Sequence, residues 1–450
     1  MNARFAHALP LPATIPPDRL TDRQRRNGLT AVMISTFLSW GGFFMVIPLV
    51  AVHYVDHLGW AAGTVGLVLA VRQLTQQGMT AFFGVLADRI GPKPIIATGM
   101  LVRATGFFAM AYASHFWPVL LAAILAGFGG SMFEAPKAAA VAALSLPETR
   151  QRLFSTLAVI SGVGTTVGTQ LGALLIRADF RIVCIAAASA YVIICLVMTA
   201  IMPNLSVSTA TPTRLETVDG AEVAGSSTGL RAVFRDRDFM LFLLLLTGYW
   251  FASSQFGLTI VLFAADITGT DASVSWLYAV NTAITIGLGY ILPRVLERWF
   301  PPIALLVVGL LVLASGLLLV GFSTNTPGLL MASAVFSVGA VLARPGQETV
   351  TANLAKPAAR GAYFGVASLS LAIGGGLGNL LGGTLYDLGT RPGMAMVPWA
   401  IFFVVGSLSA AGIWTMRARF GTVRDSDPDS VSVPESGVTP PAERAAAPAR

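Results

Sequence analysis

Glu134 is a lone carboxylate within a long run of small and apolar residues, and Lys137 follows it three positions later. A carboxyl group between an apolar environment and a neighbouring cation is suited to take up and release a proton. Arg344 occupies the corresponding position in the second half of the chain, 210 residues further on. Glu134 could therefore carry a proton, or it could form a fixed ion pair with Lys137 or Arg344. The sequence leaves both interpretations open.

A second polar group follows another apolar run. Arg72 is followed by Gln73, Gln76 and Gln77, and the three amides share one helix face because of their three- and four-residue spacing. Such a face borders either a water-filled path or a neighbouring helix, and we interpret it as part of a path. We assign further aromatic and amide-bearing residues to the same path: Trp40, Phe43, Phe44, Tyr249, Trp250, Gln255 and Asn281.

The composition of this path indicates the kind of molecule that would use it. Aromatic rings give a large apolar surface, and the amides add a few hydrogen-bonding groups. Amphipathic organic molecules suit such a wall better than sugars, which need many fixed polar partners. Ordinary packing between helices would explain some of the same aromatic residues. We expect Arg103, the one charged residue of another apolar run, to snorkel or to pair structurally rather than to contact substrate.

Twelve apolar stretches would hold these side chains in place. Apolar residues make up 55% of the 450 residues and charged residues only 11%, against about 25% in soluble domains. Each stretch reaches the roughly 20 residues that cross a bilayer as a helix. Because lipid offers the backbone no hydrogen-bonding partner, we expect an all-α integral membrane protein. The predicted spans are 29–52, 61–83, 95–113, 117–145, 153–176, 182–203, 239–265, 273–295, 303–323, 327–354, 362–386 and 395–416.

The stretches form two halves that repeat at a shift of 209 or 210 residues, so that Pro136 matches Pro345. Glycines recur at every fourth position in the fifth and eleventh stretches, namely Gly164, Gly168, Gly172, Gly374, Gly378 and Gly382. They leave a bare stripe that a neighbouring backbone can approach, either for packing alone or also for sliding. We expect two pseudo-symmetric six-helix bundles. The predicted organisation is a cytosolic tail (1–28), a first bundle (29–203), a cytosolic linker (204–238), a second bundle (239–416) and a disordered cytosolic tail (417–450).

Lys and Arg are distributed unevenly among the connecting segments. Loops on one side carry most of them, while the opposite loops carry only Arg177, Arg181 and Arg391. Because basic loops stay in the cytosol, we expect a multi-pass protein of the cell's inner membrane with both termini cytosolic. Scattered basic residues predict contact with anionic lipid head groups rather than with nucleic acid. Cys184 and Cys195 are eleven positions apart in one span, too distant for a disulfide bond.

The loop after the second span carries a dense pattern. It reads Gly84-Val-Leu-Ala-Asp88-Arg89-Ile-Gly91-Pro-Lys93. This pattern resembles the signature loop of the major facilitator superfamily, which stands at the same place in that fold. Other stretches resemble the MdtH-type multidrug transporters, a branch of the drug:proton antiporters, among them 72–78, 93–101, 179–184, 235–237 and 371–376.

We predict that the signature loop acts as a conformational latch. Asp88 would lie near the start of the eleventh span, where the partial positive charge of a helix N-terminus stabilises a carboxylate. Arg89 and Lys93 would brace it or bind lipid head groups. The latch would join the two halves on the cytosolic side. The alternative is a solvated turn whose charges only orient the loop.

The resemblance implies a secondary active transporter that exports small amphipathic or drug-like molecules in exchange for protons. A metabolite importer or facilitator is the alternative within the same fold, and a membrane-embedded enzyme or a sensor is an alternative outside it. We expect a monomer without a cofactor. We expect no metal site, because His53, Asp56 and His57 have no evident further ligand. A nucleotide-binding P-loop is absent from the sequence, which argues against direct use of ATP.

Overall fold

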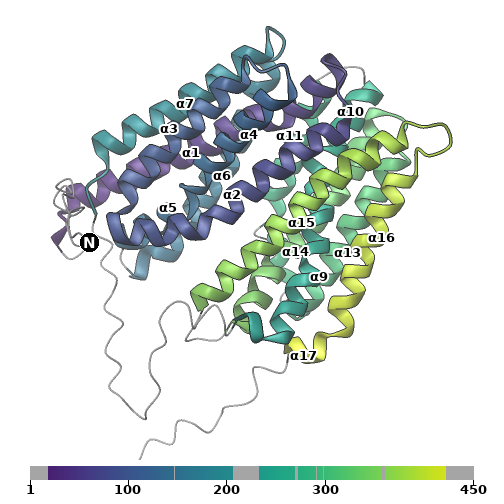
Figure 1. The fold of residues 1–450 in the computed structure, drawn as a ribbon. Coiled ribbons are helices and arrows are strands. Elements are labelled where there is room, and N and C mark those ends of the chain that lie inside the picture. Colours follow the sequence, from purple (N-terminus) through teal and green to yellow (C-terminus); the bar gives the residue numbers. More distant parts are fainter. Residues whose placement is uncertain are drawn as a thin grey trace, which may run out of the picture.

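The structure, a computed structural model, describes residues 19–145, 147–205, 233–268, 272–289, 291–296, 298–355 and 360–421. Two groups of helices lie side by side (Figure 1), and we call them the first half and the second half. The first half consists of α1 (Asp22–Val52) with a π-helical turn η2 (His53–His57), α2 (Ala62–Ile90), α3 (Pro92–Met110), α4 (Phe116–Ser131), α5 (Glu134–Leu144), α6 (Pro147–Leu175) and α7 (Phe180–Ile201).

The second half begins after residues 206–232, so that the predicted linker lies mostly outside the described residues. It consists of α9 (Arg237–Ser254), the 3-10 turn η3 (Gln255–Gly257), α10 (Thr259–Thr268), α11 (Ala272–Leu288), α12 (Ile291–Leu296), α13 (Pro302–Gly321), α14 (Thr326–Leu354), α15 (Arg360–Gly389), α16 (Val397–Thr415) and α17 (Arg417–Gly421). We call the end of the bundle at which α1 begins and α17 lies the terminal end, and the other the opposite end.

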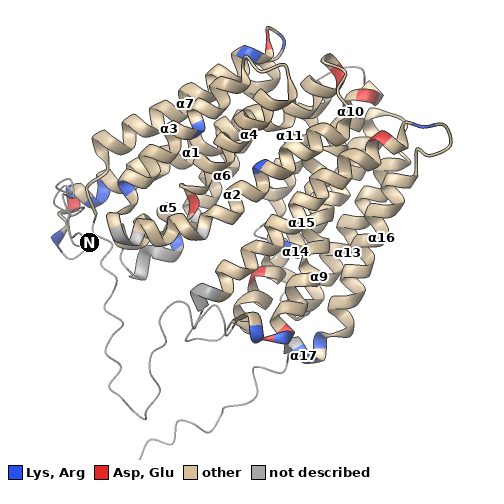
Figure 2. Ribbon diagram, viewed as in Figure 1, with Lys and Arg blue, Asp and Glu red and all other residues tan. Residues whose placement is uncertain are grey.

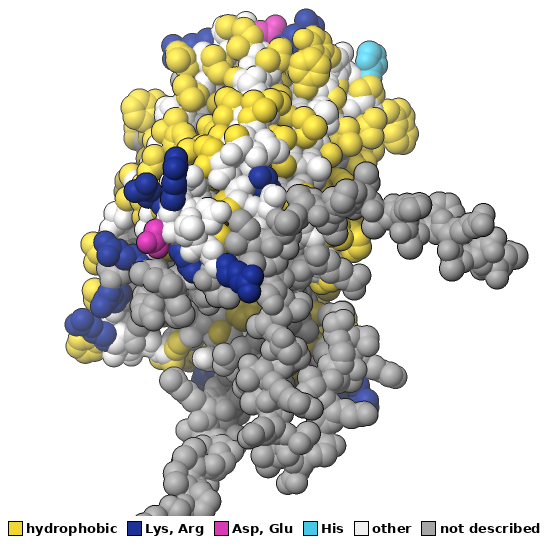
Figure 3. Space-filling view, turned by 90° about the vertical axis from the view of Figure 1, so that its left-hand side faces the viewer, with side chains coloured by type: hydrophobic (Ala, Val, Ile, Leu, Met, Phe, Trp, Pro, Cys, Tyr) yellow, Lys and Arg dark blue, Asp and Glu magenta, His cyan; other side chains and the backbone are white. Residues whose placement is uncertain are grey.

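The described part of the chain contains nine helical segments long and apolar enough to cross a bilayer. They are Asp22–His57, Phe116–Leu144, Arg152–Leu175, Phe180–Ile201, Arg237–Thr268, Pro302–Gly321, Thr326–Leu354, Tyr363–Gly389 and Val397–Thr415. Charged residues gather at the two ends of the bundle and few lie between (Figure 2). Hydrophobic side chains cover the upper part of the side face, with Lys and Arg at its top edge and below it (Figure 3). The predicted all-α membrane fold is confirmed, and nine of the twelve predicted spans meet this criterion.

Three of the predicted spans are divided rather than continuous. The span 117–145 is interrupted at Met132 and Phe133, between α4 and α5. Pro136 has no N–H to donate to the carbonyl four residues earlier, so it favours the start of a new helix there. Its counterpart Pro345 nevertheless lies inside the unbroken α14. The span 239–265 is divided into α9, η3 and α10, and the span 273–295 into α11 and α12.

The predicted glycine stripes pack helices within each half. A Cβ atom built on Gly164 would lie only 2.6 Å from the carbonyl oxygen of Phe37, and one on Gly168 would overlap that of Gly41. The glycines of α6 that contact α1 in this way are Gly164, Gly168 and Gly172, and those of α15 that contact α9 and η3 are Gly374, Gly378 and Gly382. Absent side chains therefore let α6 approach the backbone of α1, and let α15 approach the backbone of α9 and the side chain of Gln255.

The two halves meet along α2 and α15, which run antiparallel at their boundary (Figure 1). A Cβ atom on Gly66 or Gly383 would overlap backbone oxygens of the partner helix. Nearer the terminal end, a Cβ atom on Gly78 or Gly365 would have no atom of the described residues within 4 Å. The halves are therefore in close contact towards the opposite end and separate towards the terminal end.

Candidate functional site

A cavity of about 270 Å³ lies where the two halves meet, and we call it the central cavity. Helices α1 and α2 of the first half and α9, η3, α11 and α15 of the second half form its wall. The lining residues are Phe43, Phe44, Ile47, Leu69, Arg72, Gln73, Trp250, Ser253, Ser254, Phe256, Gly257, Tyr278, Leu371, Gly375 and Asn379. The interruption between α9 and α10 borders this cavity, as broken helices do at the binding sites of many transporters.

Arg72 is the charged side chain of this wall and is only 5% exposed. Its Nη1 donates to Oε1 of Gln76 at 2.8 Å, and its Nη2 donates to Oε1 of Gln73 at 3.0 Å. The guanidinium carbon lies 4.9 Å from the centre of the Phe43 ring, within the range of a cation–π contact. Gly127 of α4 makes room, because a Cβ atom there would lie 2.6 Å from the Arg72 carbonyl oxygen.

A second buried arginine lies against the same ring. Arg103 of α3 is also 5% exposed, and its guanidinium carbon lies 5.0 Å from the Phe43 ring centre and 4.9 Å from that of Tyr191. Arg103 is therefore buried against two aromatic rings and does not snorkel to the surface. Within the described ranges, neither arginine forms an ion pair with a carboxylate. Rings and amide oxygens are neutral, so the positive charges beside the cavity are not cancelled.

The structure brings five of the predicted path residues together and places six elsewhere. The five that line the central cavity are Phe43, Phe44, Arg72, Gln73 and Trp250. The six that do not are Trp40, Gln76, Gln77, Tyr249, Gln255 and Asn281. Gln255 is fully buried, and its Nε2 donates to the backbone oxygens of Phe251 and Gly378. It joins α9 to α15 rather than facing the cavity.

Several lining residues were not predicted. Phe256 and Tyr278 have ring centres 5.1 Å apart, and Phe44 lies 5.8 Å from Tyr278, so aromatic rings from both halves meet in this wall. Asn379 of α15 adds an amide. The sequence distinguishes these residues poorly from packing residues, because an aromatic side chain in a membrane helix suits either place. The one available signal is Gly257, a helix-disfavouring residue in the middle of a predicted span.

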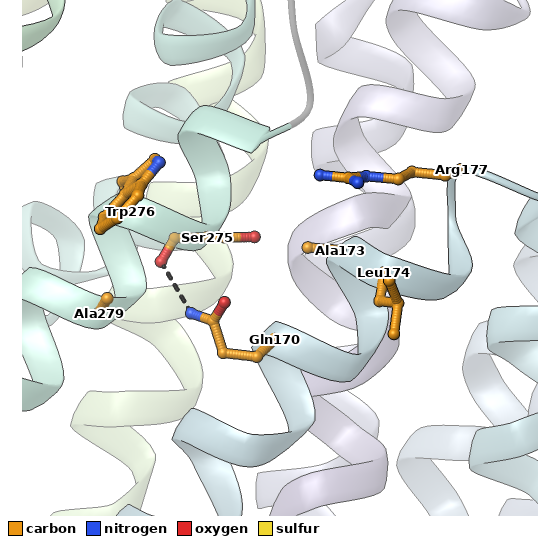
Figure 4. A pocket seen from close by; sticks show the side chains of 7 residues that line it. All are labelled: Gln170, Ala173, Leu174, Arg177, Ser275, Trp276 and Ala279. Atoms are coloured by element: carbon orange, nitrogen blue, oxygen red, sulfur yellow. Dashed lines mark hydrogen bonds between the residues drawn. The ribbon is translucent and has the colours of Figure 1, made fainter.

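A second cavity, of about 590 Å³, lies between α6 and α11 and is lined by Gln170, Ala173, Leu174, Arg177, Ser275, Trp276 and Ala279. Gln170 Nε2 donates to the Ser275 carbonyl oxygen at 3.3 Å and so bridges the two halves. The Arg177 side chain extends toward α11 (Figure 4). Arginine is thus the charged residue in the described wall of each of the two cavities.

The predicted proton-coupling residues form two separate ion pairs. Lys137 Nζ lies 2.7 Å from Oε2 of Glu134, and the Glu134 side chain is 48% exposed whereas that of Lys137 is 12% exposed. Arg344 Nε lies 3.4 Å from Oε1 of Glu348, and both side chains are well exposed. Of the two fixed pairs considered for Glu134, the structure contains the one with Lys137.

The predicted latch is described only in part. Gly84 of α2 lies against Ala135 of α5, with 3.2 Å between its built Cβ atom and the Ala135 Cβ. Gly91 has a positive φ of 89° and joins α2 to α3 in a single residue, a conformation that favours glycine. Lys93 lies in the first turn of α3. The side chains of Asp88 and Arg89 lie outside the described residues, so the latch stays a prediction.

An unpredicted contact closes the opposite end. Asp387, near the end of α15, accepts hydrogen bonds from the backbone N–H groups of Ala62 at 2.8 Å and Gly63 at 2.7 Å. These N–H groups begin α2, and its N-cap residue, Ala61, supplies no capping side chain. Asp387 therefore caps a helix of the other half. Beside it, the Tyr386 hydroxyl donates to Asp266.

Two helical halves with a cavity between them are the architecture of a class of membrane transporters. The Major Facilitator Superfamily model matches residues 32–378, and the chain belongs to this family. It is 38% identical to the multidrug resistance protein MdtH of Klebsiella pneumoniae (strain 342), over 87% of this chain and 94% of that protein. It is 37% identical to MdtH of Yersinia pestis (strain Pestoides F), over 89% of this chain and 97% of that protein.

Solved structures share the fold at low sequence identity. The bacterial homologue of the human lysosomal transporter Spinster, in an inward-facing and unoccupied conformation, superposes with a TM-score of 0.73 at 14% identity, covering 90% of this chain and all (100%) of that one. The nucleoside transporter NupG superposes with a TM-score of 0.68 at 13% identity, covering 86% of this chain and 98% of that one. At these identities the likeness supports the fold alone.

Proposed function

We propose that this chain exports small amphipathic or drug-like molecules across the inner membrane in exchange for protons. One observation carries the proposal: a cavity lined by aromatic and other apolar residues lies between two halves that touch at the opposite end and separate at the terminal end. Rocking of the halves would expose such a cavity to each side in turn. The relatives named MdtH are multidrug resistance proteins by name, which supports drug-like substrates.

We propose that the terminal end faces the cytosol. The excess of Lys and Arg in the predicted cytosolic loops supports this orientation. Basic side chains at that end would contact anionic lipid head groups, and the chain would act as a monomer. An impermeant maleimide applied to intact cells should label a cysteine placed at Leu58, which is exposed at the opposite end. Labelling only after cell lysis would reverse the proposed orientation.

Glu134 is our candidate for the proton carrier. Its carboxylate is paired with Lys137 and half-exposed, which supports access by water. Protonation would remove the charge of Glu134 and break the pair, and deprotonation would restore it. A group that exchanges a proton while it breaks and makes an ion pair can couple proton movement to a change of conformation.

Reconstitution in proteoliposomes tests coupling and direction together. Uptake of a panel of lipophilic cations, neutral drugs, zwitterions and organic acids is measured with and without an imposed pH gradient. Proton antiport predicts accumulation against the substrate gradient when ΔpH is imposed. E134Q should abolish this uphill transport and keep downhill counterflow, whereas E348Q, which removes the other paired carboxylate, should keep both. Uphill transport by E134Q would exclude Glu134 as the carrier, and ΔpH-independent flux in wild type would favour a facilitator.

A further inference from the structure

Two residues that line the central cavity carry a buried hydrogen-bond donor without an acceptor. Nε of Arg72 and Nε1 of Trp250 are both buried, and neither has a hydrogen-bond partner among the described residues. Both residues line the cavity. Arg and Trp side chains donate hydrogen bonds but accept none. Buried polar groups in proteins are almost always paired, so unpaired donors beside a cavity indicate a ligand that supplies acceptors.

The positive charge of the cavity wall also favours a ligand that supplies acceptors. None of the partners of Arg72 cancels its positive charge, because the two glutamine oxygens and the Phe43 ring carry no net charge. Arg103 adds a second buried cation against the same ring. In the parts of the chain that the structure describes, no carboxylate lines either cavity between the halves. A cationic ligand would therefore face like charge without a counter-ion.

Gln73 adds a further hydrogen-bond donor to the wall of the central cavity, beside Arg72. Its Oε1 already accepts from Arg72, and its Nε2 lies towards Gly375 of α15, 3.3 Å from where a Cβ would be. The amide N–H groups of Gln73 are thus directed to the boundary between the halves. Rings of Phe44 and Tyr278 from the two halves supply a flat apolar surface beside them.

We propose that the central cavity binds aromatic organic anions, with the carboxylate or a similar acidic group at Arg72, Gln73 and Trp250 and the ring system against the aromatic wall. This inference deepens the proposed function and rests on it, because it names the substrate class of the exporter. Charge-assisted hydrogen bonds to a carboxylate are shorter and stronger than those to a neutral acceptor. Anions are therefore preferred over neutral molecules of the same shape, and cations are disfavoured.

Equilibrium dialysis with the purified full chain in phosphatidylcholine nanodiscs tests this without any gradient. Three probes share one ring system: 2-naphthoate, its neutral methyl ester and 2-naphthylmethylammonium, with binding to empty discs subtracted. We expect naphthoate to bind at least about tenfold more tightly than either of the others. The assignment is overturned if naphthoate does not bind, or if the ester or the ammonium compound binds as tightly.

Variants then locate the anion. R72Q should reduce the preference for naphthoate over the ester to about threefold or less, and R72K should keep part of it because the cation remains. R391Q, which removes one positive charge from the loop at the opposite end, is the matched control and should bind as wild type does. A folded R72Q that keeps the full preference would contradict the role of Arg72. If R72Q does not fold, the order of the three probes on wild type decides.

The two experiments distinguish a failure of the proton-antiport proposal from a failure of the anion-site proposal. If transport in proteoliposomes ignores ΔpH but the probes bind in the expected order, proton antiport is wrong and the anion site stands. If ΔpH drives uphill transport of lipophilic cations while naphthoate does not bind, the exporter stands and the anion site is wrong.

Discussion

Replacing Asp387 with asparagine should weaken the closure at the opposite end. The carboxylate accepts one hydrogen bond from Ala62 through Oδ1 and one from Gly63 through Oδ2. Asparagine has one acceptor oxygen, and its amide nitrogen cannot accept, so one bond is lost together with the negative charge at the start of α2. A hydrogen bond to a charged group contributes about 1.5–3 kcal/mol, and we take the lower part of that range because the site is only half-buried.

A loss of about 1.5–2 kcal/mol lowers the ratio of closed to open molecules at the opposite end about 10- to 30-fold. The structure has this end closed, so the substitution should populate the conformation that is open there. D387A, which removes both acceptors, should shift the ratio further. Because the bonds join two halves of one chain, the expected effect falls on conformation rather than on the folding of either half.

Distances between spin labels measure this ratio directly. With Cys184 and Cys195 replaced by alanine, one pair of labels at Leu58 and Met394 reports on the opposite end, and another at Phe82 and Phe364 reports on the terminal side. In D387N, the distance distribution of the Leu58–Met394 pair should gain a longer component, and that of the Phe82–Phe364 pair should gain a shorter one.

The control for this experiment is D179N. Asp179 also accepts from a backbone N–H, that of Arg181 at 2.8 Å, but within one half of the molecule. D179N should leave both distance distributions unchanged. If D387N and D179N give the same distributions as wild type, the bonds from Asp387 do not hold the halves together and the reasoning is wrong.

Two further predictions concern packing within the halves. G168A should prevent close approach of α6 to α1, because its methyl group would overlap the Gly41 carbonyl oxygen, whereas G162A meets no atom within 4 Å and should fold as wild type does. Size-exclusion profiles in detergent compare the two, and a G168A protein as monodisperse and active as G162A would contradict the close packing. Q255L removes the bonds that Nε2 donates to Phe251 and Gly378 and the bond that Oε1 accepts from Thr259. It should lower stability by about 2–4 kcal/mol, measured as a lower midpoint temperature in thermal unfolding. An unchanged midpoint temperature would mean that the hydrogen bonds of the Gln255 amide do not contribute to stability.

The fold followed from the sequence because hydropathy and the positions of basic residues are local properties. Twelve apolar stretches and a repeat of about 210 residues are enough to predict two similar helical halves. The interruptions did not follow, and Pro136 and Pro345 explain why. The two prolines occupy matching positions, yet one begins α5 after a turn and the other lies inside α14. Whether a helix breaks at proline depends on the neighbours that satisfy the freed carbonyl, which one sequence does not reveal.

The sequence predicted the part of the candidate site that carries a charged residue, because burying a charge in a membrane span costs free energy and is rare. Arg72, with its neighbouring glutamines, is conspicuous in an apolar span and does line the central cavity. Tyr278 and Phe256 line it equally, but an aromatic residue in a membrane helix gives no such signal. Asp387 was missed for a different reason. Its partners are backbone N–H groups of Ala62 and Gly63, and a backbone donor has no residue type by which a pattern could identify it.

The arrangement of α2 and α15 connects the observed closure with the predicted latch. In an antiparallel pair, the N-terminus of each helix lies beside the C-terminus of its partner. Asp387 stands near the end of α15 and caps the start of α2. Asp88 stands near the end of α2, and its predicted partner is the start of α15. One chemical contact, a carboxylate on the N-terminus of a helix from the other half, would then occur at both ends of one helix pair.

Alternation requires that only one of these two contacts be made at a time. The helices touch at Gly66 and Gly383 and are apart at Gly78 and Gly365, so in this conformation the contact of Asp387 is made. If the halves rocked so that the terminal end closed, the start of α2 would move away from the end of α15, where Asp387 lies. If that is how the two contacts are related, D88N and D387N should shift the label distances in opposite directions, and the double variant should lie between them. Shifts of both variants in the same direction would show that the two carboxylates do not oppose each other.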